Sequence, residues 1–145
     1  MLQSKVEAKV EARPADVTLT GLRALRVVLA FQVMLGLLWG ISMLFFASKI
    51  ILGDPSGGHI EKIAMEGASH FMLVFGAILV WRAPRESASA LTLMVFLNAL
   101  WAVTDLVYIP LFHLTALDFP AKLAVNAVLT IGLAWSGWRA GLLSR

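Results

Sequence analysis

The sequence predicts an all-α, polytopic membrane protein, an antiparallel bundle of four transmembrane helices. Of its 145 residues, 59% are hydrophobic and 14% are charged, whereas soluble domains carry about 25% charged residues. The hydrophobic residues gather in four long stretches that short polar segments separate. Because a small soluble globule leaves much of its surface in water, lipid has to cover the apolar surface that this chain cannot bury.

The chain divides into a polar tail, residues 1–22, and a four-helix transmembrane domain, residues 23–145. The tail contains the near-repeat Lys5-Val-Glu-Ala and Lys9-Val-Glu-Ala, which is too short and too polar to bury a core. The first span is predicted at about residues 27–48. At about 1.5 Å per residue it is about 33 Å long, enough for a hydrocarbon core of about 30 Å.

The remaining spans follow from the same alternation of apolar runs and polar breaks. A turn is expected at Gly53–Gly58 because glycine, proline, aspartate and serine dominate it. Asp118 and Pro120 are typical of a helix start, as N-cap and first-turn residue. The three further spans are predicted at residues 63–81, 88–111 and 120–138. Short loops between spans favour antiparallel neighbours in a bundle.

Small residues form patterns that allow close approach of another helix. Gly36 and Gly40 are a small-xxx-small pair in the first span. The last span and the residues after it supply four more small residues, Gly132, Ser136, Gly137 and Gly141. These six positions are the predicted helix-packing residues.

Charge distribution predicts the topology. Of the 12 Lys and Arg residues, nine lie in the N-terminal segment, in residues 82–87 and at the C-terminus, and three lie on the other side. Positive residues accumulate on the cytoplasmic side of membrane proteins, so both termini are expected in the cytoplasm. Trp81, Trp135 and Trp138 fall at the same ends, where aromatic belts form. This placement of the basic residues argues against nucleic acid as a partner.

Polar residues inside the spans define a candidate site near the outer side. Glu66 and His70 are four residues apart and share a helix face. Asn98, Trp101 and Asp105 form one stripe of the third span, and Lys122, Asn126 and Thr130 form one of the fourth. An ionisable group facing lipid at the bilayer centre costs about 2.5–3.5 kcal/mol. We therefore predict that these stripes face each other.

This polar layer has two interpretations, a structural network or a binding site for a ligand or partner. Glu66 taken alone has a simpler interpretation: its carboxylate is either solvated or paired with Lys62. A metal site is not predicted, because cysteine is absent and one histidine lies within the spans, without His-Glu-x-x-His spacing. No nucleophile–base–acid set is recognisable, which favours a non-enzymatic protein. The cofactor stays unknown, with a quinone or lipid compatible with the layer.

A family resemblance adds to this reading. Glu66-Gly67 at the outer end of the second span, Gly76 at its centre and Trp81-Arg-Ala-Pro84 after it resemble the small four-helix proteins of the DoxX-like and BphX-like families. The resemblance covers about residues 23–139. It implies a bacterial inner-membrane bundle, and for some relatives a link to quinone-dependent respiratory or oxidative complexes. It carries over no catalytic residue.

Two functions follow as expectations. In the first, the protein is an accessory or assembly subunit of a membrane complex, and Gly36/Gly40 and Gly137/Gly141 pack on other membrane helices, in a homo-oligomer or a larger assembly. In the second, it binds or carries a small hydrophobic molecule, a quinone or lipid, in an outer-leaflet cavity headed by Glu66, His70 and Asp105. The first is the main expectation from the sequence, and the second is its alternative.

Overall fold

The computed structural model describes residues 18–50, 57–111 and 118–143, and these residues form an all-α structure without strands. Its four helices are α1 (Leu19–Ile50), α2 (Gly57–Arg82), α3 (Ala88–Leu111) and α4 (Asp118–Arg139). The predicted tail repeat, Lys5 to Ala12, lies outside the described residues, as do His113 and most of the predicted turn at 53–58.

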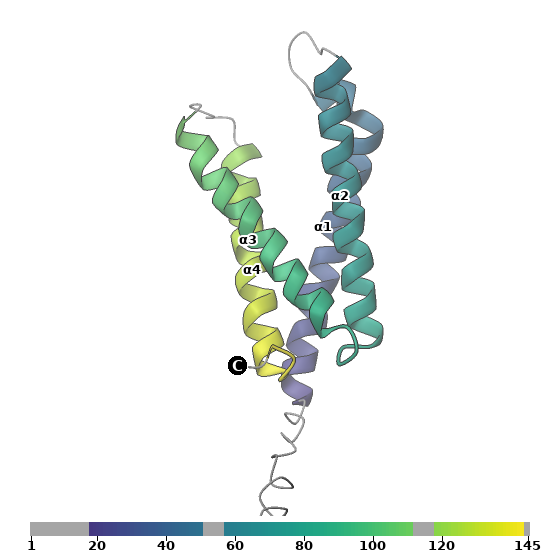
Figure 1. The fold of residues 1–145 in the computed structure, drawn as a ribbon, viewed down its shortest axis with the longest axis vertical. Coiled ribbons are helices and arrows are strands. Elements are labelled where there is room, and N and C mark those ends of the chain that lie inside the picture. The colour runs from purple at the N-terminus through teal and green to yellow at the C-terminus, as the bar shows by residue number, and fades with distance from the viewer. Residues whose placement is uncertain (1–17, 51–56, 112–117, 144–145) are drawn as a thin grey trace, which may run out of the picture.

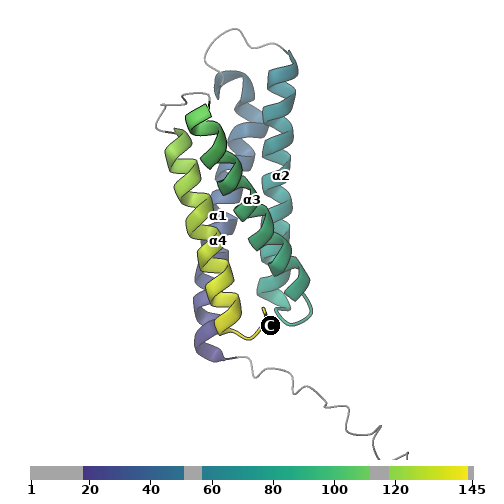
Figure 2. The ribbon, with the colours of Figure 1, turned by 60° about the vertical axis from the view of Figure 1, so that its left-hand side comes forward.

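The helices form two pairs that meet at one end of the molecule and diverge toward the other (Figure 1). α1 packs most extensively against α2, and α3 against α4, while the contacts between the pairs, α1 with α4 and α2 with α3, are less extensive. We call the end where α1 begins and α4 ends the basal end, and the opposite end, where α2 and α4 begin, the distal end (Figures 1 and 2). The order around the bundle makes α1 and α3 diagonal to each other, and likewise α2 and α4.

Among the described residues, three helices are long and apolar enough to cross a membrane: Leu19–Phe46, Ile63–Arg82 and Ala88–Val107, with mean hydropathies of 2.1, 1.8 and 1.8. They suit a membrane protein. α4, the fourth predicted span, is not among them, and its Lys122 and Asn126 lower its apolar character. The outer faces of the helices expose large apolar side chains suited to lipid contact, among them Phe31, Met34, Met72, Phe75, Phe96, Val103 and Ile131.

The helix bounds agree with the predicted spans most closely for α3, which covers the predicted residues 88–111. α1 begins at Leu19, inside the predicted tail, and its axis is interrupted at Phe46, where φ is −121° and ψ is 18°. α2 begins at Gly57, so Gly57 and Gly58 are helical although the sequence predicts a turn there. Residues outside the apolar runs extend α1, α2 and α4 beyond their predicted bounds, which is why the apolar runs underestimate these three lengths.

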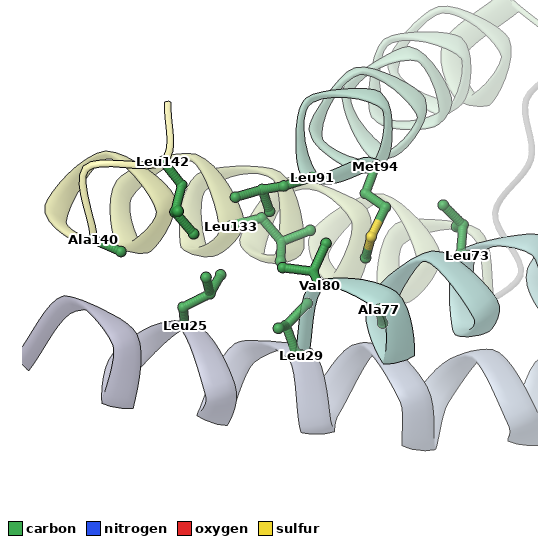
Figure 3. Close-up of a cluster of buried hydrophobic side chains, with 10 residues drawn as sticks. All are labelled: Leu25, Leu29, Leu73, Ala77, Val80, Leu91, Met94, Leu133, Ala140 and Leu142. Carbon is green, nitrogen blue, oxygen red and sulfur yellow. The ribbon is translucent and has the colours of Figure 1, made fainter. Parts of the chain in front are cut away.

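The apolar core fills the basal half of the bundle. Leu25 and Leu29 of α1, Leu91 of α3 and Leu133 of α4 are at most 1% exposed. Figure 3 shows these side chains pointing toward one another from different helices. The complete cluster consists of Leu25, Leu29, Leu73, Ala77, Val80, Leu91, Met94, Leu133, Ala140 and Leu142.

Backbone contacts join α1 to α4 at the basal end. The Thr18 hydroxyl accepts a hydrogen bond from the Gly21 backbone N–H, at 3.1 Å, and so caps α1. The same hydroxyl donates to the Arg139 carbonyl oxygen at 2.6 Å. A Cβ atom added at Gly21 would collide with the backbone of Arg139 and Ala140. Glycine is therefore required at this junction because two backbones touch there.

Gly141 has a different role from the predicted helix packing. Its φ of 72° lies in the left-handed region that favours glycine. The Leu142 N–H donates to the Gly137 carbonyl at 2.9 Å, and the Gly141 N–H to the Trp138 carbonyl at 2.9 Å. This is the Schellman pattern, in which glycine ends the helix and its last carbonyls find donors.

The other predicted small residues pack inside the chain itself. Gly36 faces Val74 and Gly40 faces the carbonyl of Gly67, both on α2, where added Cβ atoms would lie 2.6 Å and 3.2 Å from these neighbours. In α4, Gly132 lies against Val28, Gly137 lies against Leu91 and Leu143, and the buried Ser136 hydroxyl donates to the Gly132 carbonyl. These faces bring helices of one chain together.

Candidate functional site

A small cavity lies among the four helices, on the distal side of the apolar core. Its volume is about 20 Å³, which accommodates about one water molecule. Side chains from every helix line it: Gln32, Leu35, Gly36 and Trp39 of α1, His70 of α2, Asn98 and Trp101 of α3, and Lys122, Val125, Asn126 and Leu129 of α4. The lining combines polar and aromatic groups, in contrast to the purely apolar core.

A hydrogen bond crosses the bundle at the level of this cavity. The Asn98 amide nitrogen donates to the Gln32 side-chain oxygen at 3.1 Å and to the Met94 carbonyl at 2.8 Å. Asn98 is 1% exposed and Gln32 is 2% exposed. This bond links α1 to α3, which are diagonal in the bundle. The side-chain oxygen of Asn98, Oδ1, has no hydrogen-bond partner within the described structure.

His70 is held between two tryptophans. Its ring centroid lies 4.7 Å from that of Trp101 in an edge arrangement, and 6.5 Å from that of Trp39. His70 is 7% exposed. Its Nε2 atom is buried and, among the residues that the structure describes, has no hydrogen-bond partner. Most buried polar groups in proteins have one, so Nε2 of His70 and Oδ1 of Asn98 stand out.

A second diagonal contact lies on the distal side of His70. Lys122 of α4 forms an ion pair with Glu66 of α2, and both side chains are partly exposed. Beside it, the Asn126 amide nitrogen donates to the Asp105 carboxylate at 3.2 Å, which joins α3 to α4. The predicted stripes of the third and fourth spans therefore meet at Asn126 and Asp105, and the Glu66 face of the second span meets Lys122.

The structure separates the predicted ligand-binding residues into two groups. His70, Asn98, Trp101 and Asn126 line the cavity. Three others do not: Glu66 and Asp105 each contact one residue that does, and the Thr130 hydroxyl donates to the Asn126 carbonyl of its own helix. The sequence also allowed Lys62 as a partner of Glu66, and the Lys62 side chain lies outside the described ones.

Gln32 and Trp39 belong to the site although sequence analysis did not select them. Lys122 belongs to it as well, and it was predicted only as part of a stripe. A signal for Gln32 existed, because it is an amide in an otherwise apolar span, and polar residues within spans face the bundle interior. Trp39 carried no such signal. Its position opposite His70 results from the crossing of α1 and α2.

The chemistry available in the cavity is hydrogen bonding and aromatic contact. The described residues contain no group of three His, Asp, Glu or Cys side chains close enough to hold a metal ion. Nε2 of His70 can donate or accept, according to the tautomer, and Oδ1 of Asn98 accepts. A ligand hydroxyl can satisfy both atoms, because it donates to Oδ1 and accepts from Nε2–H, whereas a ligand carbonyl can satisfy only Nε2.

Comparison of the chain with protein-family models, with curated proteins and with solved structures found no match.

Proposed function

We propose that the chain is a four-span bundle of a bacterial inner membrane that binds a small hydrophobic molecule between its two helix pairs. The ligand carries a hydroxyl or carbonyl head group, as a quinone or a polar-headed lipid does. The observation that carries this proposal is the burial of two polar atoms, His70 Nε2 and Asn98 Oδ1, that have no hydrogen-bond partner among the described residues and belong to the lining of one cavity.

The energetic argument starts from the cost of leaving these atoms unpaired. A buried donor or acceptor without a partner costs about 1–3 kcal/mol. A quinol hydroxyl supplies a donor to Asn98 Oδ1, and a quinone carbonyl accepts from the His70 Nε2–H tautomer. Trp39 and Trp101, which flank the imidazole, provide aromatic surfaces for the ring of such a head group. A quinol hydroxyl between the two atoms satisfies both, because it donates to Oδ1 and accepts from Nε2–H, whereas a quinone carbonyl satisfies only His70 Nε2.

Entry of a ring-sized head group requires the helix pairs to separate, because the cavity holds about one water molecule. The distal end is suited to this motion. There α2 and α4 are joined by the Lys122–Glu66 pair, and polar side-chain contacts between membrane helices contribute only about 0.6 kcal/mol on average. The helix pairs already diverge in this direction (Figure 1). The distal end is therefore the proposed entrance.

The basal end is proposed to face the cytoplasm. The Arg26 guanidinium lies 5.9 Å from the Trp81 ring centroid, and that of Arg139 lies 5.3 Å from the Trp135 ring centroid. These exposed tryptophans and arginines form a belt typical of an interface. The positive-inside bias of the sequence supports the same orientation.

The accessory-subunit function receives less support. It relied on glycine faces available to other chains, whereas Gly36, Gly40 and Gly137 contact helices of this chain. Such a subunit would need another surface. The polar cavity favours the ligand-binding function because it supplies a specific site, and the exposed apolar faces are equally suited to lipid.

Native mass spectrometry of the protein extracted gently from its own membranes tests the proposal. We expect a bound small molecule on each chain, and loss of this molecule in His70→Phe and in Asn98→Leu. Ser136→Ala is the matched control, because it also removes a buried polar group but lies outside the cavity. A stoichiometric protein partner without a small molecule would favour the subunit function instead. Equal retention by all variants would disprove the assigned site.

Tryptophan fluorescence gives a second, independent test with a known probe. Replacing Trp81, Trp135 and Trp138 by Phe leaves Trp39 and Trp101, both in the cavity lining. A short-chain benzoquinone should quench this fluorescence in a saturable manner, and His70→Phe should abolish the saturable part. Quenching that rises linearly with quinone concentration and ignores His70 would exclude quinone binding at this site.

A further inference from the structure

A separate apolar groove of about 650 Å³ runs between α1 and α2 in the basal half of the molecule. Met34 and Leu37 of α1 and Ile78 of α2 form part of its lining, and Ala30 contributes a small side chain. Arg82 is the charged residue of the lining. The groove shares no residue with the inner cavity.

Two exposed arginines mark the basal end of this groove. Arg82, in the last turn of α2, belongs to the lining. Arg26 of α1 lies over the ring of Trp81, which also lines the groove. The ion pair found in the described part of the chain joins Lys122 to Glu66, so neither arginine has a carboxylate partner there. The groove thus combines an apolar body with two guanidinium groups at one end.

The groove lining on α1 runs from Ala30 to Leu37, and together with Arg26, about one turn before it, it spans about one leaflet of a bilayer. From Arg26 to Leu37 the rise along α1 is about 16 Å, at about 1.5 Å per residue. Half of a hydrocarbon core of about 30 Å is about 15 Å. A lipid whose phosphate lies at Arg26 therefore has an acyl chain long enough to follow the groove to Leu37.

We propose that this groove binds an anionic phospholipid of the leaflet at the basal end. Its phosphate contacts Arg26 and Arg82, and one acyl chain packs along Met34, Leu37 and Ile78. Guanidinium groups bind phosphate through paired, charge-assisted hydrogen bonds. Basic pockets between helices on the cytoplasmic side are suited to acidic head groups.

Charge complementarity selects this occupant over a helix of a partner protein. A partner helix must offer acidic residues at one defined level to pair with Arg26 and Arg82. A phospholipid presents its phosphate at that level because of its position in the bilayer. The groove requires only that the head group be anionic.

Native mass spectrometry in detergent, with phosphatidylglycerol or phosphatidylcholine added in equal amounts, tests the proposal on the full chain. We expect one phosphatidylglycerol per chain to be retained in preference to phosphatidylcholine. Arg82→Gln and Arg26→Gln should each lower this retention about fivefold, the effect expected for one basic residue near an anionic surface. Ala30→Phe should lower it without changing the charge, because the ring fills the groove.

Two matched variants control for charge and bulk. Arg139→Gln removes an arginine that also lies over a tryptophan, but on α4, and Ala124→Phe adds a ring on the exposed face of α4. Both should retain phosphatidylglycerol as the unmodified chain does. Equal retention of the two lipids, or equal losses in Arg82→Gln and Arg139→Gln, would overturn the proposal. A co-purifying protein lost only in Ala30→Phe, with lipid retention unchanged, would also overturn it.

Discussion

The basal and distal ends of this bundle are held together by different forces. At the basal end, α1 and α4 touch backbone to backbone at Gly21, and Thr18 bonds to the Arg139 carbonyl. An apolar core adjoins this junction. At the distal end, the helix pairs diverge, and long polar side chains connect them, Lys122 to Glu66 and Asn126 to Asp105. Close backbone packing holds the basal end together, whereas polar contacts between flexible side chains hold the distal end together.

Under the proposed function, this difference lets the bundle stay stable at the basal end while the distal end opens to a ligand. Helix association in lipid depends on close packing more than on hydrophobic burial, because lipid is as apolar as the core. The basal end supplies that packing. The distal contacts can break and re-form at low cost, since side-chain hydrogen bonds between membrane helices average about 0.6 kcal/mol. The cavity lies between the tightly packed basal end and the distal polar contacts.

Gly21→Ala should produce the largest loss of stability. The new Cβ atom would meet the backbone of Arg139 and Ala140, and backbone cannot move aside cheaply, so the free energy of unfolding should fall by about 2 kcal/mol. Denaturation by SDS in mixed micelles, followed by circular dichroism, measures it. Gly76→Ala is the control, because its Cβ would meet only the flexible Met94 side chain, at 3.2 Å. Equal losses of stability in both variants would contradict the conclusion that close backbone packing at Gly21 holds the basal end together.

Thr18→Ala should come next, with a loss of about 1 kcal/mol or slightly more from the missing cap. The Arg139 carbonyl also loses its donor. Thr18→Ser keeps the hydroxyl and should remain near the stability of the unmodified chain in the same SDS titration. If Ser and Ala at this position behave alike, the hydroxyl does not hold the junction.

Asn98→Leu should have an effect of about 1 kcal/mol, within the range found for hydrogen bonds between membrane helices. The change removes the diagonal bond to Gln32, and Gln32 then remains buried without that partner. The double variant Gln32→Leu with Asn98→Leu should recover part of the loss, because no polar group is left unpaired. A double variant whose loss of stability equals or exceeds the sum of the two single losses would disprove this pairing.

The Lys122–Glu66 pair should show the smallest effect. A double-mutant cycle with Lys122→Met and Glu66→Gln should give a coupling energy of about 0.6 kcal/mol or less, because the pair is partly exposed. Raising the salt concentration should reduce it further. A coupling energy larger than the stability lost in Gly21→Ala would show that the distal end is held more strongly than the basal end. It would argue against the distal end as the proposed entrance.

Much of the architecture could be predicted from local patterns. The third helix was predicted at residues 88–111 because its apolar run begins after the 82–87 hairpin and ends near Pro110, and α3 has these bounds. The i, i+3, i+7 rule placed Asn98, Trp101 and Asp105 on one face. Asn98 and Trp101 do line the cavity, and Asp105 contacts Asn126 beside it.

Other features depended on partners that local patterns do not identify. The small residues at 36 and 40 indicated a close helix contact, but not that α2 of the same chain would supply it. Gly141 resembled a packing residue, yet its positive φ makes it the end of α4. Trp39 gave no indication of its place beside His70, because an aromatic residue in an apolar span suits lipid and interior equally.

By itself, then, the sequence determined the helical class, the apolar spans suited to a membrane and the faces on which polar residues lie. These follow from composition and from the 3.6-residue period, which are local properties. The tertiary structure decided which faces meet: Asn98 with Gln32, Lys122 with Glu66, and His70 with Trp39 and Trp101. Such pairings depend on the rotation and crossing of whole helices, and the close approaches at Gly21, Gly36 and Gly40 fix the position of α1 against α4 and α2.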